Sequence, residues 1–132
     1  MTEELRFDGQ VAVITGAGGG LGLQYALLLA SRGARVVVND IGGSVTGDGA
    51  DSEAAHAAAA EIRERGGEAV ADGHSVSSPE GGQAIIDTAI STWGRVDIVI
   101  NNAGIVRDTP LEDMTADRFE PLLDVHLKGA FY

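Results

Sequence analysis

Short apolar runs alternate along this chain with longer stretches in which apolar residues recur every three or four positions. Residues 11–14 are an uninterrupted apolar run, which is typical of a strand buried on both faces. Similar runs at residues 35–39, 68–71 and 96–100 predict three more strands. Strands of this kind, separated by helices, form a parallel sheet.

The stretches between the strands show helical spacing and capping residues at their ends. The expected helices run from the glycine cluster to Gly33, from Asp51 or Ser52 to Gly66, from Pro79 to Gly94, and from Thr115 onward. The order β-α-β-α-β-α-β-α predicts an α/β fold with right-handed crossovers, in which one doubly wound unit of four strands and four helices spans residues 1–132.

Composition narrows the classes of function. The chain has 132 residues, 9 Lys and Arg against 20 Asp and Glu, and no Cys, so disulfides, thiolate metal sites and thiol catalysis are excluded. A net charge of −11 disfavours nucleic acid as a partner. Neither a membrane-length apolar run nor a leader is evident, so we expect a cytoplasmic protein that makes no membrane contact.

The first predicted strand leads directly into a glycine-rich turn. Glycine allows a sharp turn and close approach of a ligand, and the helix that follows offers free amides to an anion. The common G-x-G-x-x-G pattern fails here, because its third position is Leu21 when counted from Gly16. The pattern T-G-x-x-x-G-x-G fits instead, through Thr15, Gly16, Gly20 and Gly22. We expect this loop to hold a pyrophosphate.

Two further segments follow the second and fourth strands. Asp40 stands 18 residues beyond Gly22, where a carboxylate accepts hydrogen bonds from ribose hydroxyls and repels a 2′-phosphate. It therefore favours NAD over NADP, although an Asp at this place also suits a turn cap. The sequence Asn-Asn-Ala-Gly at 101–104 ends the fourth strand and is expected to form a second wall of the same cleft.

These three motifs together resemble the short-chain dehydrogenase/reductase family, in its order and spacing. Residues 38–43 and 124–129 further resemble the (3R)-hydroxyacyl-CoA dehydrogenase domain of multifunctional β-oxidation enzymes. The resemblance implies the N-terminal half of a Rossmann-type domain, an NAD cofactor, and hydride transfer with a secondary alcohol or ketone, such as a 3-hydroxyacyl thioester. It also implies a homo-oligomer, either a dimer or a tetramer.

The resemblance also implies a cofactor site. Its members are Gly16, Gly19, Gly20, Leu21, Gly22, Asp40, His74, Ser75, Asn102, Ala103 and Gly104. His74 departs from the family pattern, which places an Asp there against the adenine, whereas the Ser75 backbone remains able to contribute.

The last predicted helix carries two unusual residues. His126 lies on an apolar stripe and is expected to point inward, where most of the family has Asn and the hydroxyacyl-CoA branch has His. We assign it no acid or base role. Pro121 removes one hydrogen bond and is expected to bend the helix.

The family's catalytic Ser and Tyr-x-x-x-Lys do not occur in these residues, and Tyr132 does not match that Tyr. We therefore assign no catalytic residue and expect the cofactor-binding half of an enzyme about twice as long, inactive alone. Such a half would have an open sheet edge and would self-associate.

Three other readings stay open. A non-catalytic nucleotide-binding module would have the same glycine loop. A phospho-receiver domain is disfavoured, because it needs acidic residues where Thr15 and Gly16 stand. A methyltransferase is disfavoured by the Asn-Asn-Ala-Gly segment at 101–104.

Overall fold

The structure, a computed structural model, describes residues 3–42 and 53–132. Four parallel strands form one sheet in the order β3-β2-β1-β4. They are β1 (Val11–Thr15), β2 (Arg35–Asn39), β3 (Glu68–Asp72) and β4 (Ile98–Ile100). The predicted parallel sheet is confirmed, and β4 is shorter than expected, although the Asp97 amide still donates to the Val11 carbonyl.

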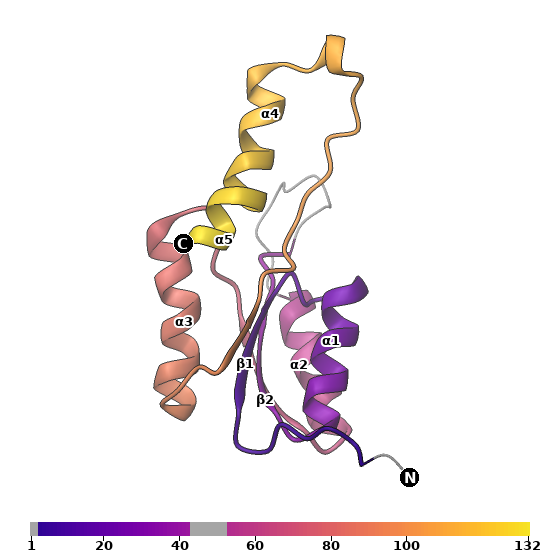
Figure 1. The fold of residues 1–132 in the computed structure, drawn as a ribbon, viewed down its shortest axis with the longest axis vertical. Helices are drawn as coiled ribbons and strands as arrows, with labels where there is room; N and C mark the ends of the chain where they lie inside the picture. Colours follow the sequence, from indigo (N-terminus) through magenta and orange to yellow (C-terminus); the bar gives the residue numbers. More distant parts are fainter. Residues whose placement is uncertain (1–2, 43–52) are drawn as a thin grey trace.

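Helices cover both faces of the sheet (Figure 1). They are α1 (Gly20–Ser31), α2 (Glu53–Glu64), α3 (Pro79–Trp93), the 3-10 turn η1 (Leu111–Asp113), α4 (Ala116–Leu123), the π-helical turn η2 (Asp124–Lys128) and α5 (Gly129–Phe131). The expected start of the second helix at Asp51 or Ser52 lies outside the described residues.

Side chains that alternate along β1 and β2 supply two separate cores. Ile14, Val36 and Val38 pack with α1 and α2, whereas Val13 and Val37 pack with α3. Both strands are therefore buried on both faces, which accounts for their uninterrupted apolar runs. The doubly wound α/β fold that the sequence predicts is confirmed.

The capping prediction for α3 is confirmed at both ends. The Ser78 hydroxyl accepts a hydrogen bond from the Gly81 amide at 3.0 Å, and Pro79 follows at the first helical position. Gly94 ends the helix with a φ of 78°, in the left-handed region that glycine favours. Residues next to its ends therefore mark where this helix begins and ends.

The helix predicted from Thr115 onward is confirmed, with Thr115 at its N-cap position, although its winding is not regular throughout. Pro121 lies inside α4, and three residues further on the chain enters the π-helical turn η2 before the short α5. These elements extend beyond the carboxyl ends of the strands (Figure 1). Phe119, Leu127 and Phe131 are exposed on them.

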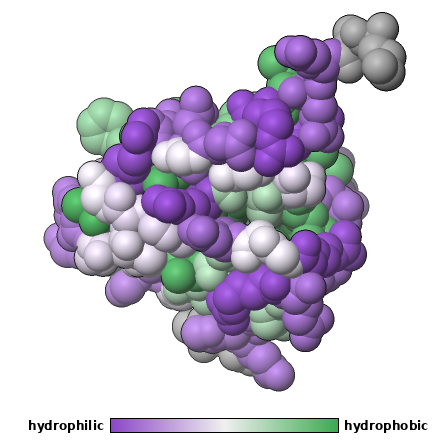
Figure 2. All heavy atoms as spheres, turned by 90° about the horizontal axis from the view of Figure 1, so that it is seen from below, coloured by the Kyte–Doolittle hydropathy of each residue, from purple (hydrophilic) through white to green (hydrophobic). Residues whose placement is uncertain are grey.

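The end of the sheet at which the strands begin has a different surface. Seen from there, hydrophilic residues are interspersed with small hydrophobic patches (Figure 2). Within the described ranges, no helix has the length and apolar character that a bilayer crossing requires.

Candidate functional site

A cleft of about 560 Å³ opens at the carboxyl ends of the strands. It involves β1 and β4, between which the strand order reverses, and ligands of doubly wound sheets bind at such a point. The residues that line the cleft are Gly16, Gly19, Gly20, Asn39, Asp40, Ile41, Gly42, Ser75, Val76, Ser77, Asn102, Ala103, Gly104, Ile105, Arg107, Pro121, Asp124 and Val125.

The glycine loop forms the wall between β1 and α1. Gly16 has a φ of +64°, and a Cβ there would lie 2.9 Å from the Cα of Ala103, so the loop backbone lies close against the Asn-Asn-Ala-Gly segment. Gly19 is exposed, with open space around it. The first turn of α1 has neither a side-chain cap nor an acidic residue. Its amides and positive dipole end therefore remain available to an anion.

Thr15 and Asn102 hold the two walls together. The Thr15 hydroxyl accepts hydrogen bonds from the amides of Asn102 and Ala103, at 3.1 and 3.0 Å. The Asn102 side chain in turn donates to the carbonyls of Thr15 and Gly16, at 3.0 and 3.1 Å. The cleft is therefore fixed by side-chain bonds to backbone that join the ends of β1 and β4.

Asp40 follows β2 and lies in the cleft wall, half-buried. Its carboxylate accepts hydrogen bonds from the amides of Gly18 at 2.9 Å and Gly42 at 2.7 Å, one on each oxygen. The bond from the Gly42 amide is the turn cap that the sequence analysis gave as the alternative role of Asp40. A carboxylate has about four acceptor positions, so these two bonds leave capacity for ribose hydroxyls.

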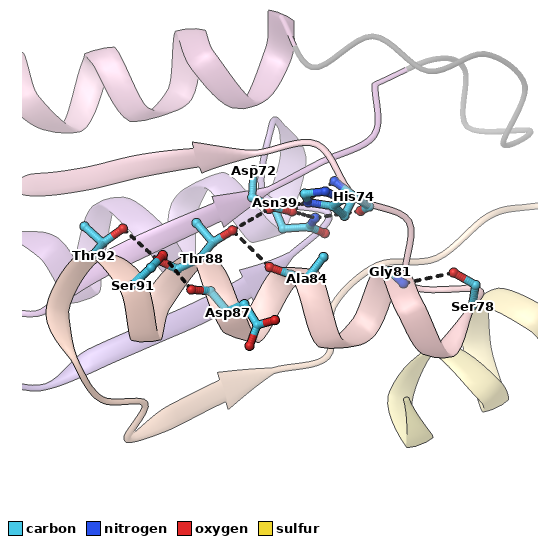
Figure 3. A network of polar contacts seen from close by, with 10 residues as sticks. All are labelled: Asn39, Asp72, His74, Ser78, Gly81, Ala84, Asp87, Thr88, Ser91 and Thr92. Atoms are coloured by element: carbon cyan, nitrogen blue, oxygen red, sulfur yellow. Dashed lines mark hydrogen bonds and ion pairs between the residues drawn. The ribbon is translucent and has the colours of Figure 1, made fainter.

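A buried polar network lies beside Asp40, at the ends of β2 and β3 (Figure 3). Asp72, whose side chain is 2% exposed, accepts hydrogen bonds from Asn39, from Thr88 and from both the ring and the amide of His74, at 2.7 to 3.0 Å. Burial raises the pKa of Asp72, but the bonds from His74, Asn39 and Thr88 outweigh burial and hold the pKa below its ordinary value. The carboxylate thus stays ionised and holds the His74 ring.

The expected site residues separate into two groups. Gly16, Gly19, Gly20, Asp40, Ser75, Asn102, Ala103 and Gly104 line the cleft. Leu21, Gly22 and His74 do not. Leu21 is 67% exposed, Gly22 is buried against the side chain of Asn102, and His74 is held by Asp72 with its ring exposed.

The expectation that His126 points into an apolar core is wrong. The ring is exposed, and Nε2 lies 2.8 Å from the carbonyl oxygen and 3.1 Å from the amide nitrogen of Ile105. Nε2 donates to the Ile105 carbonyl in the tautomer that carries a proton there, and accepts from the Ile105 amide in the other tautomer. The ring also lies so close to Gly104 that a Cβ there would be 2.7 Å from Cε1. His126 therefore supports the cleft wall through backbone.

Sequence reasoning missed several residues of the cleft. They are Asn39, Ile41, Gly42, Val76, Ser77, Ile105, Arg107, Pro121, Asp124 and Val125. For those near Asp40 and Ser75, proximity to a predicted strand end was an available signal. For Pro121 and Asp124 there was none, because they reach the cleft only through the packing of α4 and η2.

The arrangement suits an extended ligand with an anionic centre. It offers free amides at a helix start, a carboxylate for hydroxyl groups and a flat wall of Ala103 and Gly104. No group of three or more potential metal ligands occurs among the residues that the structure describes.

Comparisons with known proteins agree with this geometry. The family model described as short chain dehydrogenase matches residues 10–132. A crystal structure of a short chain dehydrogenase from Mycobacterium avium matches with a TM-score of 0.86 and 46% identity, over 94% of this chain and 44% of that one.

Curated relatives are similar over nearly the whole chain. The peroxisomal multifunctional enzyme type 2 of Drosophila melanogaster is 56% identical, over 97% of this chain and 21% of its own length. The peroxisomal hydratase-dehydrogenase-epimerase of Neurospora crassa is 52% identical, over 99% of this chain and 14% of its own. The chain thus spans about a fifth or less of these two relatives.

The names of these relatives contradict the expectation of a cytoplasmic protein, which was wrong. That expectation rested on the hydrophobicity pattern of the given residues. Peroxisomal proteins are sorted by short signals that receptors read, which leave no mark on hydrophobicity or composition.

Proposed function

Because the chain belongs to the short-chain dehydrogenase family, whose members are oxidoreductases, we propose that its cleft binds NAD and that the protein transfers hydride between nicotinamide and a secondary alcohol or ketone. The resemblance of residues 38–43 and 124–129 to (3R)-hydroxyacyl-CoA dehydrogenase domains supports a 3-hydroxyacyl thioester as the substrate, and one of the relatives described above is named as a dehydrogenase. The nicotinamide supplies the hydride chemistry when bound. This chain's residues bind and orient it.

The cofactor would extend along the cleft from Asp40 to Gly104. The glycine loop and the amides at the start of α1 suit the pyrophosphate, and Asp40 suits the adenosine ribose. Asn102, Ala103 and Gly104 would line the ribose on the nicotinamide side. Gly22 would act indirectly, since it lets Asn102 approach the loop.

The preference for NAD rests on Asp40. Its position is fixed by the Gly18 and Gly42 amides, so the carboxylate cannot turn away from a 2′-phosphate without losing two hydrogen bonds. Neither Lys nor Arg occurs between residues 15 and 31 to balance such a phosphate. Repulsion in this half-buried place therefore favours NAD.

The test is fluorescence titration of the full-length protein with NADH and NADPH. We expect NADH to bind at least tenfold more tightly, and Asp40→Asn to reduce that ratio at least tenfold, while Asp87→Asn on the exposed face of α3 leaves it unchanged. Equal binding of the two cofactors by the unmodified protein would refute the proposal. Cofactor binding without any turnover of a 3-hydroxyacyl thioester would favour the non-catalytic module instead.

We also propose that the protein is a homo-oligomer. The exposed apolar side chains of α4, η2 and α5 support self-association. Sedimentation of the full-length protein as a monomer would contradict this.

A further inference from the structure

Arg107 is the only Lys or Arg among the residues described as lining the cleft. Among the residues that the structure describes, its guanidinium donates one hydrogen bond, to the neighbouring Val106 carbonyl at 3.2 Å, and forms an ion pair with no carboxylate. A guanidinium has five donors, so most of the hydrogen-bonding capacity of Arg107 is unused.

Most of the arginines that the structure describes have a carboxylate partner, and Arg107 does not. The arginines that form ion pairs are Arg6, Arg32, Arg35, Arg65 and Arg95. The two carboxylates in the cleft wall have other partners, because Asp40 accepts from two backbone amides and Asp124 pairs with Lys128 at 2.8 Å. Neither acid is engaged with Arg107.

Arg107 comes from the segment that follows the Asn-Asn-Ala-Gly wall of the cleft, and not from the glycine loop. It stands three residues beyond Gly104 in a chain segment without helix or strand, so its Cα lies within about 11 Å of that of Gly104. Two residues before it, Ile105 contacts His126 of η2. Arg107 therefore belongs to the wall that continues past the nicotinamide side, whereas the amides suited to pyrophosphate lie at α1.

We propose that Arg107 binds an oxyanion, a carboxylate or a phosphate, of the second substrate. This inference rests on the proposed function, since it assumes that a dinucleotide occupies the cleft from Asp40 to Gly104. The planar guanidinium fork matches either oxyanion with two parallel hydrogen bonds. The substrate class is therefore an anionic one: a coenzyme thioester, through its phosphates, or a free hydroxy acid, through its carboxylate.

Calorimetric titration of the full-length protein, saturated with NADH, tests the assignment. Coenzyme A and 3-hydroxybutyrate are the two probes. Coenzyme A supplies phosphates and 3-hydroxybutyrate supplies a carboxylate, so the probe that responds identifies the source of the oxyanion. We expect Arg107→Gln to weaken one probe at least tenfold, and Arg107→Lys, which keeps the charge but not the fork, to weaken it by less. NADH affinity should stay within twofold. Arg118→Gln, an exposed arginine of α4 outside the cleft, is the matched control.

Three other outcomes overturn the proposal. An unmodified protein that binds NADH but neither probe has no oxyanion site, and equal probe affinities in Arg107→Gln and the unmodified protein exclude Arg107. A tenfold loss of NADH affinity in Arg107→Gln assigns the arginine to the cofactor. If the unmodified protein does not bind NADH, the proposed function fails, and titration of the two probes alone still decides whether Arg107 binds them.

Discussion

The two ends of the sheet are built from different kinds of polar contact. Where the strands begin, exposed ion pairs predominate, Arg35 with Glu68 at 2.8 Å and Arg95 with Asp97 at 2.7 Å, and one of these carboxylates, Asp97, also accepts a hydrogen bond from the Val11 amide. Where the strands end, side chains hold backbone: Thr15 binds the amides that follow β4, and Asp40 binds those of Gly18 and Gly42.

The difference shows which polar contacts of this fold tolerate change and which ones fix the path of the backbone. Exposed ion pairs are screened by water and contribute little to stability, so they tolerate change. A side chain bonded to backbone fixes where a loop runs, and its loss leaves an amide unpaired. The Arg95 side chain and the Val11 amide lower the pKa of Asp97, yet that carboxylate stays near solvent. Tight geometry is found at the end that carries the cleft.

The largest expected effect is at Gly22. A Cβ there would lie 2.5 Å from both Asn102 Nδ2 and the Gly16 carbonyl, so Gly22→Ala must displace backbone. We expect a loss of about 3 kcal/mol in the free energy of unfolding, measured by urea denaturation, together with loss of NADH binding.

Gly19→Ala is the matched control, because a Cβ at Gly19 meets open space and its φ of −169° is extended backbone. Its stability should stay within about 0.5 kcal/mol, while NADH binds more weakly if the loop approaches the phosphates. Equal losses of stability in the two variants would contradict the close packing at Gly22.

The next effect concerns Asp72. Asp72→Asn removes a buried carboxylate that accepts from three side chains, and we expect a loss of about 2 to 3 kcal/mol at pH 7. Since the pKa of Asp72 is lowered in the folded protein, its contribution to stability is present above the ordinary aspartate pKa of 3.8 and is lost as the pH falls below it.

The difference in stability between Asp72→Asn and the unmodified protein should therefore shrink below pH 3.8. Urea denaturation at pH 7 and at pH 3 measures it. A difference that stays constant across this range would show that Asp72 titrates normally in the folded protein.

Thr15→Val comes third. It keeps the shape of the side chain but removes the acceptor of two amides, so we expect a loss of about 1 to 2 kcal/mol and weaker NADH binding. Thr15→Ser retains the hydroxyl and should restore both. If Val and Ser behave alike, the hydroxyl does not hold the two walls together.

The smallest effect is at the opposite end of the sheet. The side chains of Arg35 and Glu68 are 40% and 61% exposed, so Arg35→Gln should change stability by less than about 0.5 kcal/mol and leave NADH affinity unchanged. A loss comparable to that of Thr15→Val would remove the distinction between the two ends.

The strand pattern and the position of the cleft were predictable from the sequence. The apolar run of β2 marks both its ends, and Ser78 and Gly94 mark those of α3, because these signals act within a few residues. The glycine loop, Asp40 and Asn102 were expected in one cleft, since the carboxyl ends of parallel strands meet.

The network around Asp72 was not predictable. Its partners come from β2 and α3, at 33 and 16 residues from Asp72, and only the assembled sheet brings them together. The place of Arg107 in the cleft depends likewise on the path of a segment with no regular structure, for which periodicity carries no information.

The π-helical turn η2 sets the rotational phase of everything that follows it. An α-helix advances about 100° per residue, so removing one residue from a wide turn to restore regular winding rotates the rest of the helix by about that angle. Gly129, which lies closely against Val76, and Tyr132, which lies against Gly82, would then both leave their contacts with the body of the domain. One additional residue in a turn thus aligns the C-terminal helix with α3 and the cleft wall at the same time.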